Sequence, residues 1–243
     1  MVRRARDAWH TSDVDTGPGP GTTRRGAAIG ADAIGAGAGA GAIGAGGGRS
    51  ATRRRVTKES DVFVTIDLDG AGRSEVTSGL PFFDHMLAQL ARHGGFDLVV
   101  RTSGDLVVDA HHSVEDTGIT LGEVFAAALG DKVGVRRFAS VAVPLDEALV
   151  DVAVDLSGRA YLRYDVAFGP DASPLGTPGF EPQLAEEFWR AFATSAGMTL
   201  HVALRYGRNS HHIVEASFKA VARALRDALR VEGDTVPSTK GVL

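Results

Sequence analysis

The sequence predicts an α+β protein in which antiparallel sheets carry helices on one face. Apolar and polar residues alternate along short segments such as residues 62–68, which is the period of a half-buried strand. Longer amphipathic segments end at glycine, as at Gly95 and Gly197, which is typical of helix ends. A gapless alignment of the two halves places His85 over Glu187 and Gly95 over Gly197, so each half repeats one β-rich unit with two helices.

The first half is predicted to contain two hairpins and two helices. Strands at residues 62–68 and 74–77 flank the turn signal Asp69-Gly70. Pro81 favours the first turn of a helix, and the glycine pair at positions 94 and 95 ends that helix. The remaining predicted elements are a hairpin of residues 96–101 and 106–109 and a helix at residues 111–129.

The second half is predicted to repeat this order around a Gly/Pro-rich loop at residues 169–182. Alternation and glycine stops carry the prediction here as well. The predicted strands are residues 141–143, 148–156, 161–168 and 198–206, and the predicted helices are residues 184–196 and 211–230.

Residues 1–52 differ in composition from the rest, because alternating glycine and alanine follow an arginine-containing start. Such a segment cannot bury a core, so we expect a disordered Gly/Ala-rich leader. It lacks the ~20 apolar residues of a membrane span and the compact apolar core of a secretory signal. Order is expected from residue 53, in one domain made of pseudo-repeats at about residues 53–137 and 138–243.

The whole composition is that of an ordinary globular protein, with 44% hydrophobic and 23% charged residues. The formal net charge of −4 provides no basic field for nucleic acid, and no segment predicts a membrane partner. The chain has no cysteine, which excludes disulfides and thiolate metal sites and fits a cytoplasmic, reducing location. Any metal site must therefore use imidazole and carboxylate ligands.

Two matching segments, residues 109–116 and 209–216, each contain His-His-x-x-Glu. Their first histidines are 100 residues apart, in a chain with only eight histidines. Residues four apart on a helix share one face, whereas the next residue turns away by about 100°. We therefore expect His111 with Glu115, and His211 with Glu215, to bind metal ions.

The second histidine of each pair then faces a different metal, so the two motif helices must face each other, within one subunit or between two. One predicted metal takes His111, Glu115 and His212, and the other takes His211, Glu215 and His112. Glu187 and His85, from the preceding helices, are candidates for a fourth ligand each. Nitrogen and oxygen ligands with room for a substrate suit a roughly octahedral manganese site.

Other polar residues are weaker candidates. Asp146 and Glu147 follow Pro144 and are consistent with acid/base groups or with a turn at a strand entry. Residues 238–241, Ser-Thr-Lys-Gly, offer hydroxyl, ammonium and amide donors for a phosphate. Further cations that could hold an anion are Arg137, Arg159, Lys219 and Lys240.

From about Arg54 to Leu243 the chain resembles the imidazoleglycerol-phosphate dehydratase family. The resemblance rests on motifs at residues 81–87, 109–116, 144–148, 155–159, 211–219 and 238–241. It implies a monofunctional hydro-lyase that converts D-erythro-imidazoleglycerol phosphate to imidazoleacetol phosphate in L-histidine biosynthesis. It further implies two ribosomal-protein-S5-domain-2-like repeats, a 24-subunit homo-oligomer with active sites between subunits, and two Mn²⁺ per active site bridged by the substrate imidazole.

Carried over by position, the resemblance assigns the ligands to the same two groups. The chain departs from the family pattern at Glu187, where many members have histidine, and at Ala139, where glycine is more usual. Glu59 is our first choice for proton transfer, followed by Asp146 and Glu147. Metal one takes His85, His112, His211 and Glu215, and metal two takes His111, Glu115, His212 and Glu187; substrate contacts fall on Glu59, Arg137, Arg159, Lys219, Ser238 and Lys240, together with the ligands His85, His111, Glu115 and His211.

Two other functions use the same residues. A dimetal hydrolase would employ these ligands with a bridging hydroxide and would release inorganic phosphate from phosphomonoesters. A non-enzymatic metal-binding assembly protein would need the ligands but not the phosphate-binding cations.

Overall fold

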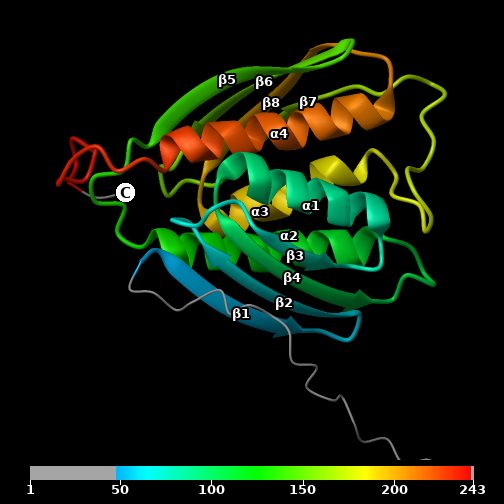
Figure 1. Ribbon diagram of the computed structural model, residues 1–243, viewed down its shortest axis with the longest axis horizontal. Helices are drawn as coiled ribbons and strands as arrows, with labels where there is room; N and C mark the ends of the chain where they lie inside the picture. Colours follow the sequence, from blue (N-terminus) through cyan, green and yellow to red (C-terminus); the bar gives the residue numbers. More distant parts are fainter. Residues whose placement is uncertain (1–47, 242–243) are drawn as a thin grey trace, which may run out of the picture. The chain divides into compact units, whose positions relative to one another are not determined.

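The computed structural model describes residues 48–241, so residues 1–47 of the leader predicted at residues 1–52 lie outside them. The described part contains two four-stranded sheets with four helices between them (Figure 1). Both sheets have the same strand order, β1-β2-β4-β3 and β5-β6-β8-β7. The α+β class and the tandem repeat predicted from the sequence are therefore confirmed.

The first sheet holds β1 (Ser50–Val56), β2 (Ser60–Asp67), β3 (Ser74–Thr77) and β4 (Asp97–Gly104). Alternate residues of β2 are buried, as the period-two pattern predicts. β1 and β4 flank β2 in antiparallel register, whereas β3 pairs with β4 in parallel.

The second sheet repeats this arrangement with β5 (Phe138–Leu145), β6 (Ala148–Asp155), β7 (Tyr161–Asp165) and β8 (Thr199–Tyr206). Its central strands are antiparallel, and β7 is parallel to β8. Both sheets are thus mixed, where the sequence analysis expected antiparallel sheets.

Each helix that precedes a central strand ends at a left-handed glycine. α1 (Pro81–Gly94) is capped by Gly95 at φ 77° and α3 (Leu184–Ala196) by Gly197 at φ 61°, a conformation that favours glycine. α2 (His111–Leu129) and α4 (Ser210–Ala228) begin at the two His-His motifs.

The helices of the two repeats pack in crossed pairs, α1 against α4 and α2 against α3. Phe83 of α1, Phe188 of α3 and Phe218 of α4 are fully buried where the repeats meet. The ring centroid of Phe188 lies 5.4 Å from that of Phe83 and 5.3 Å from that of Phe218. One continuous core therefore fixes the two His-His helices relative to the helices that precede them.

Four local predictions are wrong. Residues 50–52 were assigned to the leader but belong to β1. Residues 74–77 do not pair with β2, because β4 lies between β2 and β3 in the sheet. Residues 106–109 form a turn instead of a strand. Residues 166–168 lie beyond the end of β7.

No helix within residues 48–241 combines the length and the apolar character required to cross a membrane.

Candidate active site

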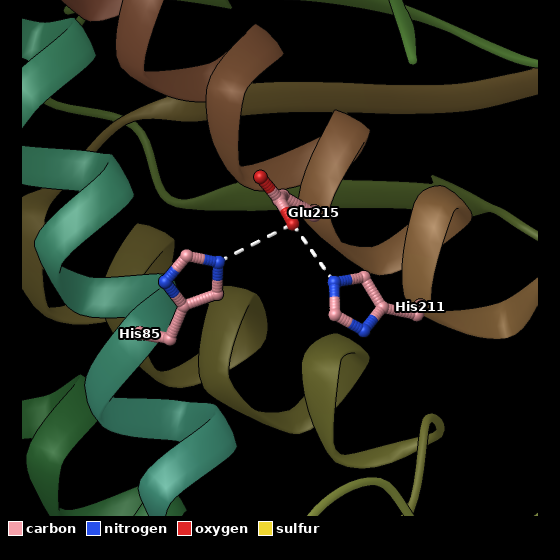
Figure 2. A group of neighbouring side chains, drawn as sticks. All are labelled: His85, His211 and Glu215. Atoms are coloured by element: carbon pink, nitrogen blue, oxygen red, sulfur yellow. Dashed lines mark hydrogen bonds and ion pairs between the residues drawn. The ribbon is translucent and has the colours of Figure 1, made fainter. Parts of the chain in front are cut away.

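His85, His211 and Glu215 form a compact three-residue cluster between α1 and α4 (Figure 2). Oε2 of Glu215 lies 3.3 Å from Nε2 of His85 and 3.0 Å from Nε2 of His211. One ligand atom from each residue lies within 4.8 Å of the others, and within residues 48–241 this is the one group of three or more such side chains that converge so closely. The sequence predicted all three as ligands of the same metal.

The cluster is half open to solvent. Both histidine side chains are about half-exposed, whereas only 10% of the Glu215 side chain is exposed. Burial would raise the pKa of Glu215, but the hydrogen bond from Lys219 and its positive charge hold that pKa below its ordinary value. Lys219 Nζ lies 2.7 Å from Oε1, so the predicted phosphate-binding lysine contacts the predicted metal ligand.

The corresponding group on α2 and α3 is looser. Nε2 of His111 lies 3.9 Å from Oε2 of Glu115, on the same face of α2. Glu187 of α3 makes an ion pair with Arg190 at 3.7 Å. α3 packs on α2 as α1 packs on α4, so α3 corresponds to α1. Glu187 and His85 therefore lie on corresponding helices.

The second histidine of each motif contacts a different carboxylate through Nδ1. Nδ1 of His112 lies 3.0 Å from Oδ2 of Asp105, and Nδ1 of His212 lies 2.7 Å from Oε2 of Glu147. The hydrogen bond to Asp105 raises the pKa of His112. The hydrogen bond to His212, followed by those from the backbone amides of Asn209 and Arg208, lowers the pKa of Glu147 to about 2.

The two motif helices begin in the same way. Oδ1 of Asp109 accepts a hydrogen bond from the His111 amide at 2.8 Å, and Oδ1 of Asn209 accepts one from the His211 amide at 2.9 Å. Side-chain acceptors at these positions stabilise the exposed amides of a helix start. The residue two positions before each His-His pair thus helps to fix where the first imidazole leaves the helix.

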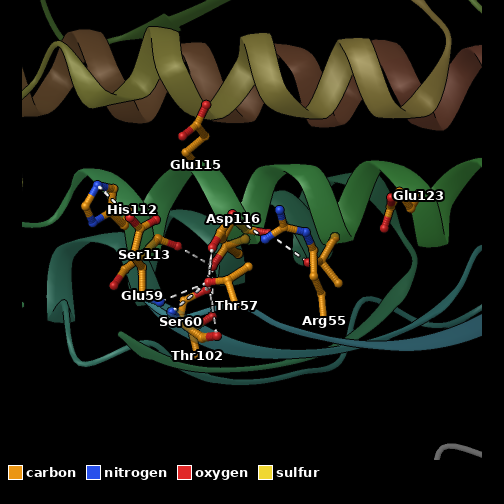
Figure 3. Close-up of polar contacts among 12 residues, drawn as sticks. Arg55, Thr57, Glu59, Ser60, Thr102, His112, Ser113, Glu115, Asp116 and Glu123 are labelled. Carbon is orange, nitrogen blue, oxygen red and sulfur yellow. Dashed lines mark hydrogen bonds and ion pairs between the residues drawn. The ribbon is translucent and has the colours of Figure 1, made fainter. Parts of the chain in front are cut away.

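Glu59 lies on the turn between β1 and β2, next to α2 (Figure 3). Its Oε1 is 3.9 Å from Nε2 of His112, and its side chain is 53% exposed. The turn is held by an Asp116 cluster that we define as Arg55, Thr57, Ser60 and Asp116, in which the buried Asp116 carboxylate accepts hydrogen bonds from the other three.

Figure 3 also shows that Glu115 leaves α2 on the opposite side from Asp116. The two sides of α2 therefore make different contacts. One side presents Glu115 toward α3, and the other anchors the turn that carries Glu59.

Two of the predicted phosphate-binding cations, Arg137 and Arg159, lie beside Asp155. Nε of Arg137 donates to Asp155 at 2.7 Å, and its NH1 donates to the Pro237 carbonyl at 2.7 Å. Arg159 lies 3.5 Å from the same carboxylate, with its side chain 68% exposed. Arg137 thereby connects Pro237, the residue before Ser238, to Asp155 at the end of β6. The more exposed Arg159 lies beside the same carboxylate.

Asp146 and Glu147 form the two-residue turn between β5 and β6. Asp146 has φ 47°, a conformation that aspartate tolerates better than most residues. Its carboxylate lies 3.7 Å from Nε2 of His212. The residues are therefore part of a turn and also lie beside a predicted metal ligand.

A single chain brings together only part of each predicted ligand set. His85, His211 and Glu215 meet, as do His111 and Glu115, while His112 and His212 lie with carboxylates of their own repeats. Asp105 and Asp155 were not singled out from the sequence, since neither stands at a ligand spacing from the residue it contacts. Their importance follows from the tertiary structure alone.

The donor set fits a divalent transition metal. Imidazole nitrogen and carboxylate oxygen suit manganese, iron or zinc, and the half-open cluster leaves positions for further ligands. The nearest atoms of His85, His211 and Glu215 converge on one point between the helices (Figure 2). The residues that would hold the ion are thus arranged for it.

The sequence of the chain is similar to those of known proteins of one family. The family model described as imidazoleglycerol-phosphate dehydratase matches residues 78–225. The enzyme of this name from Gluconacetobacter diazotrophicus is 55% identical over 198 residues, covering 80% of this chain and 98% of its own. The one from Methanopyrus kandleri is 50% identical over 195 residues, covering 80% and 96%.

Solved structures agree as well. The imidazoleglycerol-phosphate dehydratase of Pyrococcus furiosus matches with a TM-score of 0.67 and 39% identity, covering 79% of this chain and 100% of that one. The Staphylococcus aureus enzyme matches with a TM-score of 0.67 and 35% identity, covering 75% and 99%. The chain therefore belongs to the imidazoleglycerol-phosphate dehydratase family.

Proposed function

We propose that the chain dehydrates imidazoleglycerol phosphate to imidazoleacetol phosphate in histidine biosynthesis with the help of two Mn²⁺ ions. The observation that carries the proposal is the convergence of His85, His211 and Glu215, within a family of hydro-lyases. Such a half-open nitrogen and oxygen site leaves coordination positions for the imidazole of a substrate.

The ligand sets are completed by a neighbouring copy of the chain. His112 and His212 are needed by the two sets but lie beside Asp105 and Glu147, at the start of their own helices. Their Nε2 atoms remain for a metal held mainly by another subunit. This arrangement supports active sites between subunits, in a large homo-oligomer of 24 chains.

Two Mn²⁺ bound at these ligands would act as Lewis acids toward the imidazole ring of the substrate. Hydroxide leaves from the carbon attached to the ring, and the proton to be removed lies on the adjacent carbon, which keeps its own hydroxyl group. Proton removal and hydroxide loss produce one water and an enol, which tautomerises to the ketone.

The chain's own side chains supply proton transfer and phosphate binding. Glu59 is half-exposed beside His112, on a turn held by the Asp116 cluster, so it is placed to move the proton. Arg159 and Lys240 provide charge for the phosphate, and Ser238 provides a hydroxyl. Arg137 holds the carbonyl of Pro237, the residue before Ser238.

Incubation of the manganese-loaded protein with imidazoleglycerol phosphate tests the proposal. We expect imidazoleacetol phosphate, detected by mass spectrometry as the loss of one water, with the phosphate ester intact. Release of inorganic phosphate would support a dimetal hydrolase instead. Metal binding with neither product would support a non-enzymatic metal-binding protein.

A further inference from the structure

The two repeats differ in how they hold the second histidine of each motif. β2 and β6 are each eight residues long, and Glu59 and Glu147 are the residues that precede them. β8 has a β-bulge against β6 between Leu149 and Val150, so Gly207 corresponds to Gly104, the last residue of β4. Glu59 and Glu147 are thus structural counterparts, and Arg208 is the counterpart of Asp105.

In the first repeat, Asp105 holds the histidine. Both of its carboxylate oxygens lie within 3.1 Å of Nδ1 of His112. Its amide donates to the Glu59 carbonyl at 3.1 Å, which joins the two turns. The Glu59 carboxylate faces the other ring nitrogen, Nε2, at 3.9 Å and remains half-exposed.

In the second repeat, Arg208 replaces Asp105 and Glu147 takes over its contact. Arginine has no side-chain acceptor for an imidazole N–H, and the Arg208 amide donates to Oε1 of Glu147 at 3.1 Å. Oε2 of Glu147 instead contacts Nδ1 of His212.

The contact fixes the chemical state of each imidazole. An ionised carboxylate can only accept hydrogen bonds, so the Nδ1 atom that it contacts carries the proton. The neutral ring then has its lone pair on Nε2, which is the form that binds a metal. Asp105 and Glu147 thus prepare the Nε2 atoms of His112 and His212 as ligands.

We propose that Asp105 and Glu147 are matched positioning residues for His112 and His212, and that Asp105 leaves Glu59 free for proton transfer while Glu147 is occupied in its own repeat. The proposal rests on the proposed function, because it assigns these roles within the two-metal dehydratase. It separates two glutamates that occupy equivalent positions in the fold.

The amide variants of the two carboxylates give a sharp contrast. Glu147 uses Oε1 for the amides of Arg208 and Asn209 and Oε2 for His212, so Glu147→Gln must place an NH₂ group against one of these donors. Asp105 has both oxygens on His112, so Asp105→Asn can keep an oxygen on Nδ1.

The test is calorimetric titration of the metal-free assembly with Mn²⁺, together with kcat for each variant and light scattering for assembly size. We expect Glu147→Gln and Asp105→Ala each to weaken one of the two Mn²⁺ sites about 10- to 100-fold, as loss of a ligand-orienting carboxylate typically does. Asp105→Asn should retain affinity within about threefold, since the acceptor remains. Glu75→Gln, at an exposed carboxylate beside Arg101, is the control.

Glu59→Gln provides the opposite signature. It should keep both Mn²⁺ affinities and lower kcat by about 10²-fold or more, because it removes a proton-transfer group. Wild-type Mn²⁺ affinity in both Glu147→Gln and Asp105→Ala would overturn the proposal, as would loss of metal in Glu59→Gln equal to that in Glu147→Gln. A wild-type assembly that binds no Mn²⁺ or produces no ketone would instead contradict the proposed function.

Discussion

His85 on α1 and Glu215 on α4 meet at 3.3 Å although 130 residues separate them in the sequence. The contact joins the first repeat to the second at the predicted metal site. A metal that binds there would connect helices from both repeats. Metal binding should therefore stabilise the fold as well as support catalysis, because the complete ligand set exists only in the native state.

Glu215→Gln tests this link. In the wild-type protein, Mn²⁺ at 100 times its Kd should add about 2.7 kcal/mol of stability and raise the Tm accordingly. The variant replaces an anionic oxygen ligand with a neutral amide and should lose most of that shift. Thermal unfolding with and without Mn²⁺ measures it, and an equal shift in both proteins would remove Glu215 from the metal site.

Lys240→Ala should mainly weaken substrate binding. Lys240 lies three residues after Pro237, whose carbonyl Arg137 holds, and its ammonium is proposed to bind the phosphate. Loss of one charge-assisted hydrogen bond costs about 2 kcal/mol, or roughly a 30-fold rise in KM, with kcat little changed. Steady-state kinetics decide the point, and an unchanged KM would exclude Lys240 from the phosphate site.

Asp116→Ala should damage both the fold and the turn that carries Glu59. The substitution leaves Arg55 and Ser60 without their buried acceptor, which costs about 3 kcal/mol of unfolding free energy. The turn then loosens, so kcat should fall in the protein that remains folded. Urea unfolding and kinetics measure the two effects.

A matched control for Asp116 is Asp61→Ala, which breaks an exposed ion pair with Arg54 and should leave the free energy of unfolding nearly unchanged. If Asp116→Ala were as stable and as active as Asp61→Ala, the Asp116 cluster would have no role in holding Glu59.

Asp97→Asn should make stability less dependent on acid pH. Burial would raise the pKa of Asp97, but hydrogen bonds from the Arg73 side chain and from the backbone amides of Arg73 and Ala71 outweigh it and lower that pKa. A carboxyl with a lowered folded-state pKa stabilises the fold above its unfolded pKa of about 3.9, and the stabilisation disappears as pH falls through the folded-state value.

The wild-type protein should therefore exceed Asp97→Asn by about 2 kcal/mol at pH 7, and the gap should close below about pH 4. Urea unfolding at pH 7, 5 and 3 measures the gap. A gap that stays constant over this range would show that the Asp97 charge is not the cause.

The elements with strong local signals were predicted well. α2 (His111–Leu129) and α3 (Leu184–Ala196) have the predicted bounds, because amphipathic spacing and a following glycine are local properties. β1 was missed since Arg53, Arg54 and Arg55 on an edge strand show little apolar alternation. The parallel pairing of β3 could not be predicted, because a turn signal does not say whether the next strand returns or crosses over.

The same distinction holds for the site. The i, i+4 spacing on a helix predicted His211 with Glu215, and the family resemblance assigned His85 to the same metal. The structure brings all three together. Asp105 lies seven residues before His112, whereas Glu147 lies 65 residues before His212, so no common spacing identifies these contacts. They depend on which turn the fold places beside each ring.

The most direct test of the central hypothesis starts from wild-type and His112→Ala proteins whose metal has been removed with a chelator. Turnover of imidazoleglycerol phosphate is measured as Mn²⁺ is added back. We expect wild-type turnover to rise until two Mn²⁺ are bound per chain, because each predicted site requires ligands from both His-His motifs. His112→Ala should lose one Mn²⁺ and its turnover together. Full turnover by the metal-free wild-type protein, or full Mn²⁺ occupancy and turnover by His112→Ala, would contradict the two-metal site.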